Sequence, residues 1–169
     1  MRCAEPRKTG GGEHAEGRVE SAGGGVGVRG GNLTVNGTTI SGNATGLDGG
    51  GVFAVDTSVI LNSATISGNV AGDDGGGIKL GGGSLSMTGT QVTGNHADVN
   101  GGGLQLAATG QISSSVISGN TSGNEGGGIF SNRDLDLIDS VVRNNAAEVR
   151  GGGLSLEGDT MIRGSQVLE

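Results

Sequence analysis

The chain has 169 residues, of which 40 are Gly, two are Phe, one is Pro and none is Trp or Tyr. So few aromatic residues exclude a conventional aromatic-rich core, and a single Pro excludes collagen. The net charge of −7 disfavours nucleic acids and anionic membranes as partners. No run of 18 apolar residues is present, which argues against a membrane-spanning helix, and the lone Cys3 excludes an internal disulfide framework.

Residues 1–22 are polar and do not follow the pattern of the rest of the chain. We expect this segment to be an N-terminal cap or to be disordered. It opens with MRCAEPRKTG, which lacks the apolar stretch of a secretory signal peptide. Its basic and acidic residues balance, so the net charge lies in residues 23–169.

A repeat of 25 or 26 residues organises residues 23–169. The tripeptide GGG, each time followed by an aliphatic residue, begins at Gly23, Gly49, Gly75, Gly101, Gly126 and Gly151. A second motif keeps the same spacing and reads ISGN at 40–43, ISGN at 66–69, VTGN at 92–95, ISGN at 117–120 and VRNN at 142–145. Internal repeats of this length are typical of solenoids.

Each repeat alternates apolar and polar residues with a period of two, which indicates strands with one buried face. In the second repeat this alternation covers residues 52–55, 59–61 and 64–67. Three strands of three to five residues leave no room for a helix of ordinary length. We therefore predict an all-β parallel β-helix of about six coils, spanning residues 23–169, with three short strands per coil.

Three columns of equivalent residues support stacking of the coils. The residue after GGG is always aliphatic, and the residue three positions before SGN is small in every coil. The third column is Asn, whose amide can donate to and accept from its neighbours in the stack. We interpret this column as structural rather than as a binding site; its members are Asn43, Asn69, Asn95, Asn120 and Asn145.

The GGG-[VIL] and I-S-G-N motifs resemble the short repeats of right-handed parallel β-helix proteins of the pectate-lyase-like superfamily. The likeness is greatest to bacterial cell-surface and autotransporter-passenger repeats, such as those of polymorphic outer membrane proteins. It covers residues 23–169. The resemblance implies an extracellular or cell-surface location and partners among surface glycans or proteins of host or neighbouring cells, and it carries no catalytic residue to this chain.

Two groups of acidic residues are candidate sites. Asp48, Asp73, Asp74, Asp98 and Glu125 precede the GGG corners and offer carboxylates of the kind that hard cations prefer. The equivalent column ends in Arg150, however, so we interpret these residues as solvated corner charges and expect no metal site. Neither His14 nor His96 has a partner at metal-ligand spacing.

The second acidic group, Asp134, Asp136 and Asp139, is the densest in the chain. Paired carboxylates are the machinery of glycoside cleavage, so a polysaccharide-active lyase or hydrolase that uses the Asp134–Asp139 region is an alternative function. Short loops and the absence of an aromatic platform for a sugar ring argue against it.

A second alternative is ice binding through outward Thr and Ser pairs, which begin at Thr39 and Ser41 and become irregular by the fifth coil. We also expect Phe53 and Phe130 to point outward.

The preferred hypothesis is a structural or adhesive segment of a bacterial secreted or cell-surface protein, without catalytic, cofactor-binding or metal-binding residues. The sequence stops 19 residues into the sixth coil. We therefore expect either a fragment of a longer repeat protein or a C-terminal coil that pairs with another chain, through end-to-end or further-coil contacts.

Overall fold

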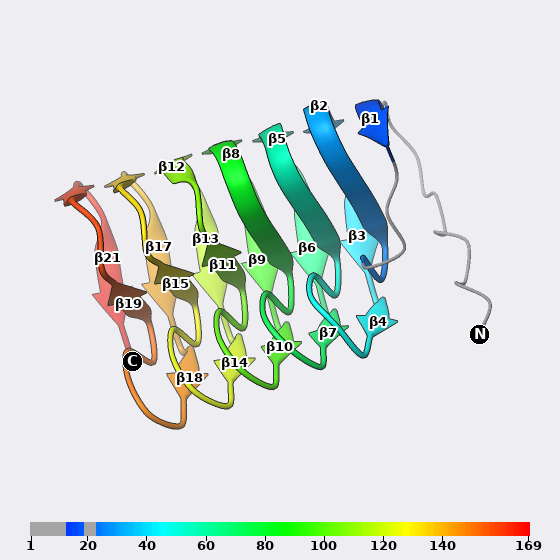
Figure 1. Ribbon diagram of the computed structural model, residues 1–169. Coiled ribbons are helices and arrows are strands. Elements are labelled where there is room, and N and C mark those ends of the chain that lie inside the picture. Colours follow the sequence, from blue (N-terminus) through cyan, green and yellow to red (C-terminus); the bar gives the residue numbers. More distant parts are fainter. Residues whose placement is uncertain (1–12, 19–22) are drawn as a thin grey trace.

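The computed structural model describes residues 13–18 and 23–169, in which every regular element is a β-strand. The chain winds repeatedly around one axis, so that each turn lies alongside the turn before it (Figure 1). Parallel pairing joins residues 25 or 26 positions apart, as in Val26↔Val52 and Leu104↔Ile129. The prediction of a six-coil parallel β-helix is therefore confirmed. Within the described residues, no helix is long and apolar enough to span a membrane.

The first sheet contains the strand that follows each GGG corner. In the first three coils this strand runs for 11 residues, longer than the three to five expected. In the third coil, Gly82 and Gly83 adopt φ of 104° and 87°, so the backbone bends there. Gly83 nevertheless stays paired with Thr57 of the previous coil, so the strand continues through the bend. Besides β1 (Glu13–Arg18), described below, the strands of this sheet are β2 (Val26–Asn36), β5 (Val52–Asn62), β8 (Ile78–Thr88), β11 (Leu104–Leu106), β12 (Thr109–Ser113), β15 (Ile129–Ser131), β16 (Leu135–Ile138), β19 (Leu154–Leu156) and β20 (Thr160–Arg163).

Two further sheets complete each coil. The second contains β3 (Thr39–Ser41), β6 (Thr65–Ser67), β9 (Gln91–Thr93), β13 (Val116–Ser118), β17 (Val141–Arg143) and β21 (Gln166–Leu168). The third contains β4 (Ala44–Thr45), β7 (Val70–Ala71), β10 (His96–Ala97), β14 (Thr121–Ser122) and β18 (Ala146–Ala147).

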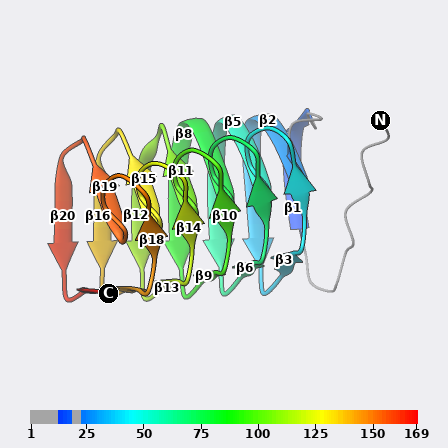
Figure 2. The same ribbon diagram turned by 90° about the horizontal axis from the view of Figure 1, so that it is seen from below.

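The N-terminal segment supplies one strand, β1 (Glu13–Arg18), which pairs antiparallel with β2. This strand lies at one end of the stack and β20 at the other (Figure 2). Residues 1–12 and 19–22, which belong to the segment expected to be a cap or disordered, lie outside the described residues.

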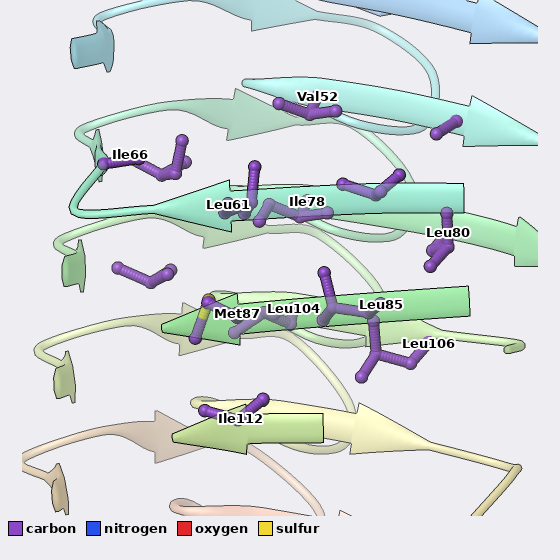
Figure 3. Packing of buried hydrophobic residues seen from close by; sticks show 14 of the residues in the cluster. Val52, Leu61, Ile66, Ile78, Leu80, Leu85, Met87, Leu104, Leu106 and Ile112 are labelled. Carbon is purple, nitrogen blue, oxygen red and sulfur yellow. The ribbon is translucent and has the colours of Figure 1, made fainter. Parts of the chain in front are cut away.

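The core is a thin column of aliphatic side chains inside the coils (Figure 3). Val52, Ile78, Leu104 and Ile129, which follow successive GGG corners, are all fully buried. Each packs on its counterparts in the neighbouring coils, so apolar area that one coil could not cover alone is removed from water.

Phe53 departs from the sequence-based expectation. It was expected to point outward into solvent, but only 9% of it is exposed. The corner that precedes the strand folds against the outer face: a Cβ placed on Gly49 would lie 2.7 Å from the Phe53 Cβ. Phe130, at the equivalent position three coils later, is half-buried.

Candidate functional site

The internal Asn column forms a continuous amide ladder. From Asn43 to Asn120, each side-chain Nδ2 donates to the Oδ1 of the Asn in the following coil, at 3.0 Å from Asn43 to Asn69 and 2.9 Å from Asn69 to Asn95. The same Oδ1 of Asn95 also accepts the backbone N–H of Asn69 at 3.0 Å. The ladder continues through Asn120 to Asn145 at 2.9 Å per step. The interpretation of this column as structural agrees with these bonds, because the amides bond to one another and to the backbone.

The GGG corner lies beside the Asn ladder, and each of its glycines is required for a different reason. Gly75 adopts φ of 70°, a conformation that favours glycine. The backbone of the neighbouring third-sheet strand leaves no room for a Cβ on Gly76. A Cβ on Gly77 would lie 2.5 Å from the Gly103 carbonyl oxygen and 3.1 Å from the Asn95 Nδ2. The three glycines therefore meet three different requirements of one corner.

The column of small residues before the second sheet is a second hydrogen-bonded ladder, which the sequence indicated only as a packing column. The Ser115 hydroxyl donates to the Ser113 carbonyl oxygen at 2.7 Å and accepts the Thr90 backbone N–H at 3.1 Å. Ser140 repeats both bonds one coil later. These hydroxyls are buried, so their bonds avoid the cost of unsatisfied polar groups inside the coils.

The acidic corner residues are only partly brought together. Asp48, Asp73 and Asp74 each place one carboxylate oxygen within 4.8 Å of the other two. No other His, Cys, Asp or Glu of the described part of the chain forms such a group of three. Asp98 and Glu125, named with them from the sequence, are not members.

Lys79 lies at this acidic corner. Its Nζ is 2.7 Å from Asp74 Oδ2 and 3.8 Å from Asp48 Oδ1, and its side chain is only 15% exposed. Burial and the two neighbouring carboxylates raise the pKa of Asp73, while Lys79 opposes that rise. Three carboxylates are fewer than the six to eight oxygen ligands that a hard cation takes, and an ammonium group already neutralises part of their charge. We interpret the corner as a cluster of ion pairs among residues of this chain.

A second ion pair extends the same corner column. Arg150 Nη2 donates to Glu125 Oε1 at 2.6 Å, and the Ser155 hydroxyl donates to the other oxygen at 2.9 Å. These hydrogen bonds lower the pKa of Glu125. In the sequence, Arg150 was the reason to expect no metal site in this column. In the structure, it is the ion-pair partner of Glu125, one coil before it.

His96 lies between a hydroxyl and a carboxylate. Its Nδ1 is 2.8 Å from Thr121 Oγ1 and its Nε2 is 3.0 Å from Asp98 Oδ1. This order of groups matches a nucleophile, base and orienting acid. However, the backbone N–H groups of Thr121 and Gly123 already donate to the preceding coil at 2.9 and 3.0 Å. They are not available as an oxyanion hole, so we interpret the group as a surface hydrogen-bond network. His14 lies in β1, whose side chains are outside the described residues.

The three acidic residues of the polysaccharide-cleavage alternative lie before, within and after β16. Asp136 lies on the outer face of β16, between the buried Leu135 and Leu137. Asp134 Oδ1 accepts the Asp159 backbone N–H at 3.0 Å. Asp139 lies at the next corner with φ of 47°, and these carboxylates form no close group of three among the described residues.

The Thr and Ser pairs of the second sheet are in register, because Thr39 pairs with Thr65 and Ser41 with Ser67. The hydroxyl pattern is lost where Val116 pairs with Val141. Ice binding through this face stays a prediction.

Sequence reasoning missed the ion pair of Lys79 and the network around His96. Lys79 aligns with Phe53 and Gln105 in the strand pairing, so the available signal was a single cationic residue five positions after Asp74.

Comparison of the chain with protein-family models, curated proteins and solved structures finds no match to any of them.

Proposed function

We propose that this chain is a non-catalytic structural or adhesive rod that belongs to a secreted or cell-surface protein. The observation that carries the proposal is the Asn ladder, which runs through five coils from Asn43 to Asn145. The Asn ladder and the Thr/Ser column before the second sheet both bond to the neighbouring coil, and this arrangement suits a stiff support better than a reactive cleft.

The resemblance of the GGG and SGN motifs to autotransporter-passenger repeats supports a cell-surface location. It also supports a place in the pectate-lyase-like superfamily, whose β-helices provide long, regular outer faces. On this proposal the partners are surface glycans or proteins of host or neighbouring cells. They would contact the outward positions, where the coils differ from one another.

The decisive experiment is a turnover assay on polygalacturonate and a panel of glycans, together with a binding assay on the same panel and on intact cells. Retention of the protein on a glycan or cell surface without product release is the expected result. Product release that disappears in Asp136→Asn would overturn the proposal and establish the polysaccharide-active alternative. Detection of the native protein only in the cytosolic fraction would overturn the proposed location.

A further inference from the structure

Lys79 and Asp74 meet beside the GGG corner that joins the second coil to the third. Asp74 immediately precedes the corner glycines, and Lys79 is the second residue of β8, on its outer face. The Lys79 Nζ lies 2.7 Å from the Asp74 Oδ2, and only 15% and 17% of the two side chains are exposed. The pair is therefore better shielded from water than the ion pair of Glu125 and Arg150, in which the Arg150 side chain is 65% exposed.

The two oxygens of the Asp74 carboxyl group have different surroundings. Oδ2 accepts a bond from the Lys79 amino group. Oδ1 instead accepts the Asn100 backbone N–H at 3.0 Å and the Asn100 Nδ2 at 3.1 Å. Two donors on one oxygen stabilise the negative charge that develops there when a nucleophile adds to the carboxyl carbon. Asp74 is thus held as an acyl group, with an amine against the oxygen that can leave.

Two further carboxyl groups lie where they can move protons. The Asp48 Oδ1 is 3.8 Å from the Lys79 Nζ. Asp48, Asp73 and Asp74 each place one carboxylate oxygen within 4.8 Å of the other two. Burial and the neighbouring carboxylates raise the pKa of Asp73, so this group keeps its proton to a higher pH than an ordinary Asp. A proton acceptor and a proton donor are therefore both next to the pair.

We propose that Lys79 and Asp74 form an intramolecular isopeptide bond, in which the Lys79 Nζ becomes the amide nitrogen of the Asp74 side chain. A lysine amine is a nucleophile once it has lost its proton, and Lys79 is the only Lys of the described residues. The reaction releases water and needs no oxidant or other reactant. It occurs once per chain, so it is compatible with a rod that has no catalytic turnover.

The atoms balance when Asp48 and Asp73 relay the protons. Asp48 takes one proton from the Lys79 ammonium. Asp73 gives its own proton to the Asp74 Oδ2. The free amine attacks the Asp74 Cγ, and the Asn100 donors stabilise the charge on Oδ1. Asp48 then passes its proton to Oδ2, so the Cγ–Oδ2 bond breaks and water leaves. The second Nζ proton goes to Asp73, and both relay groups end in the state in which they began.

The isopeptide bond converts an ion pair into a covalent link across the GGG corner. Salt weakens an ion pair near the surface, and protonation of its carboxylate removes it, whereas an amide has neither sensitivity. Amide formation removes one positive and one negative charge together. Asp73 remains beside the Asp48 carboxylate in the linked chain, so burial and that neighbour still raise its pKa.

Tryptic mapping with mass spectrometry tests the bond on the full chain. Lys79 is the only Lys or Arg between Arg29 and Arg133, and trypsin does not cleave after an acylated lysine. After denaturation and digestion, the linked chain is expected to give one uncut peptide of residues 30–133 with a mass one water below that of its sequence. An unlinked chain gives separate peptides of residues 30–79 and 80–133.

Four variants test the assigned roles. Lys79→Arg keeps the positive charge but not the nucleophile, because a guanidinium stays protonated, and it is expected to keep its full mass. Asp48→Asn removes the proton acceptor, and Asn100→Ala removes one donor to Oδ1. Each should slow bond formation at least about tenfold, measured as the linked fraction at fixed times after synthesis. Asp98→Asn, at an acidic corner residue outside the group of three, is the matched control and should not change the rate.

A wild-type chain that keeps its full mass and is cut after Lys79 would overturn the proposal. Loss of water that persists in Lys79→Arg, or that hydroxylamine reverses, would also overturn it, because it would identify a succinimide of Asp74 with Gly75. Unchanged rates in both Asp48→Asn and Asn100→Ala would overturn the mechanism. Far-UV circular dichroism of each variant establishes that the coils are folded.

Discussion

Replacement of Asn95 by Ala tests whether the Asn ladder stabilises the rod. The Asn95 Oδ1 accepts two bonds from Asn69, one from its backbone N–H and one from its Nδ2. The Nδ2 of Asn95 donates to Asn120 Oδ1 at 2.9 Å and to the Ile66 carbonyl oxygen at 3.0 Å. Ala keeps none of these four bonds.

The expected loss follows from the groups left without partners. Asn69 is fully buried. When Asn95 is replaced by Ala, the Asn69 backbone N–H and one of the two Nδ2 hydrogens lose their acceptor, while the other Nδ2 hydrogen keeps its bond to the Ile40 carbonyl oxygen. A buried unsatisfied group costs about 1–3 kcal/mol, so the two together cost about 2–6 kcal/mol. Because a folded domain has a total stability of about 5–15 kcal/mol, the change is large.

Asn62→Ala is the matched control. The Asn62 Nδ2 donates to Asn36 Oδ1 at 2.9 Å in the same amide-to-amide geometry, but this pair is exposed to solvent. Water replaces the lost partner there, so the expected change is within about 0.5 kcal/mol.

Urea unfolding followed by far-UV circular dichroism measures both variants, since the chain has no Trp or Tyr to report by fluorescence. Equal destabilisation by Asn95→Ala and Asn62→Ala would refute the reasoning. It would mean that water or local rearrangement satisfies the buried donors, and that the amide ladder contributes no more than a surface pair.

Three further predictions use the same unfolding measurement. Gly77→Ala should lower the free energy of unfolding by several kcal/mol, because its Cβ would lie 2.5 Å from a carbonyl oxygen. Gly46→Ala is the control and should be neutral, because Gly46 has open space around it. Equal effects of the two changes would contradict the close-packing argument. Burial and two neighbouring carboxylates raise the pKa of Asp73 in the folded protein. The contribution of Asp73 to the stability of the fold is therefore favourable below its ordinary pKa of 3.8, and it is lost as the pH rises through the folded-state pKa. Asp73→Asn should therefore raise the unfolding midpoint at pH 7 but not at pH 3, and a gain at both would implicate something other than charge. Gln105 is 4% exposed and its Oε1 has no hydrogen-bond partner. Gln105→Met should therefore stabilise the fold by about 1 kcal/mol, while Gln91→Met, at an exposed position, should not. Destabilisation by Gln105→Met would show that the Gln105 amide is satisfied.

The fold could be predicted because the sequence repeats its constraints in every coil. The spacing of GGG gives the register directly: the residues that follow two successive corners, such as Val26 and Val52, are paired in the structure. The Asn column was predictable as a stack for the same reason, since one polar residue recurring at an internal position needs a partner of its own kind.

The chemistry of individual corners was harder to predict because it depends on side-chain direction at irregular positions. Phe53 and Lys79 occupy equivalent outward positions, yet one is covered by the preceding corner and the other forms an ion pair with Asp74. Alternation of faces within a strand does not indicate that a neighbouring corner folds over the outer face. The His96 network was missed because its members come from two coils, 25 residues apart.

The corners and outward positions that differ between coils are where binding specificity can arise in a repeat protein. The internal ladders impose nearly the same residue on every coil, so they cannot distinguish one partner from another. The outward positions differ from coil to coil, and there the neighbouring coils create pairs that neither coil has alone, such as Lys79 with Asp74 and His96 with Thr121. On the proposal of an adhesive rod, a partner that recognises such a pair contacts two adjacent coils at once. Its affinity would then depend on the register that the Asn ladder maintains, which links the stability of the interior to recognition at the surface.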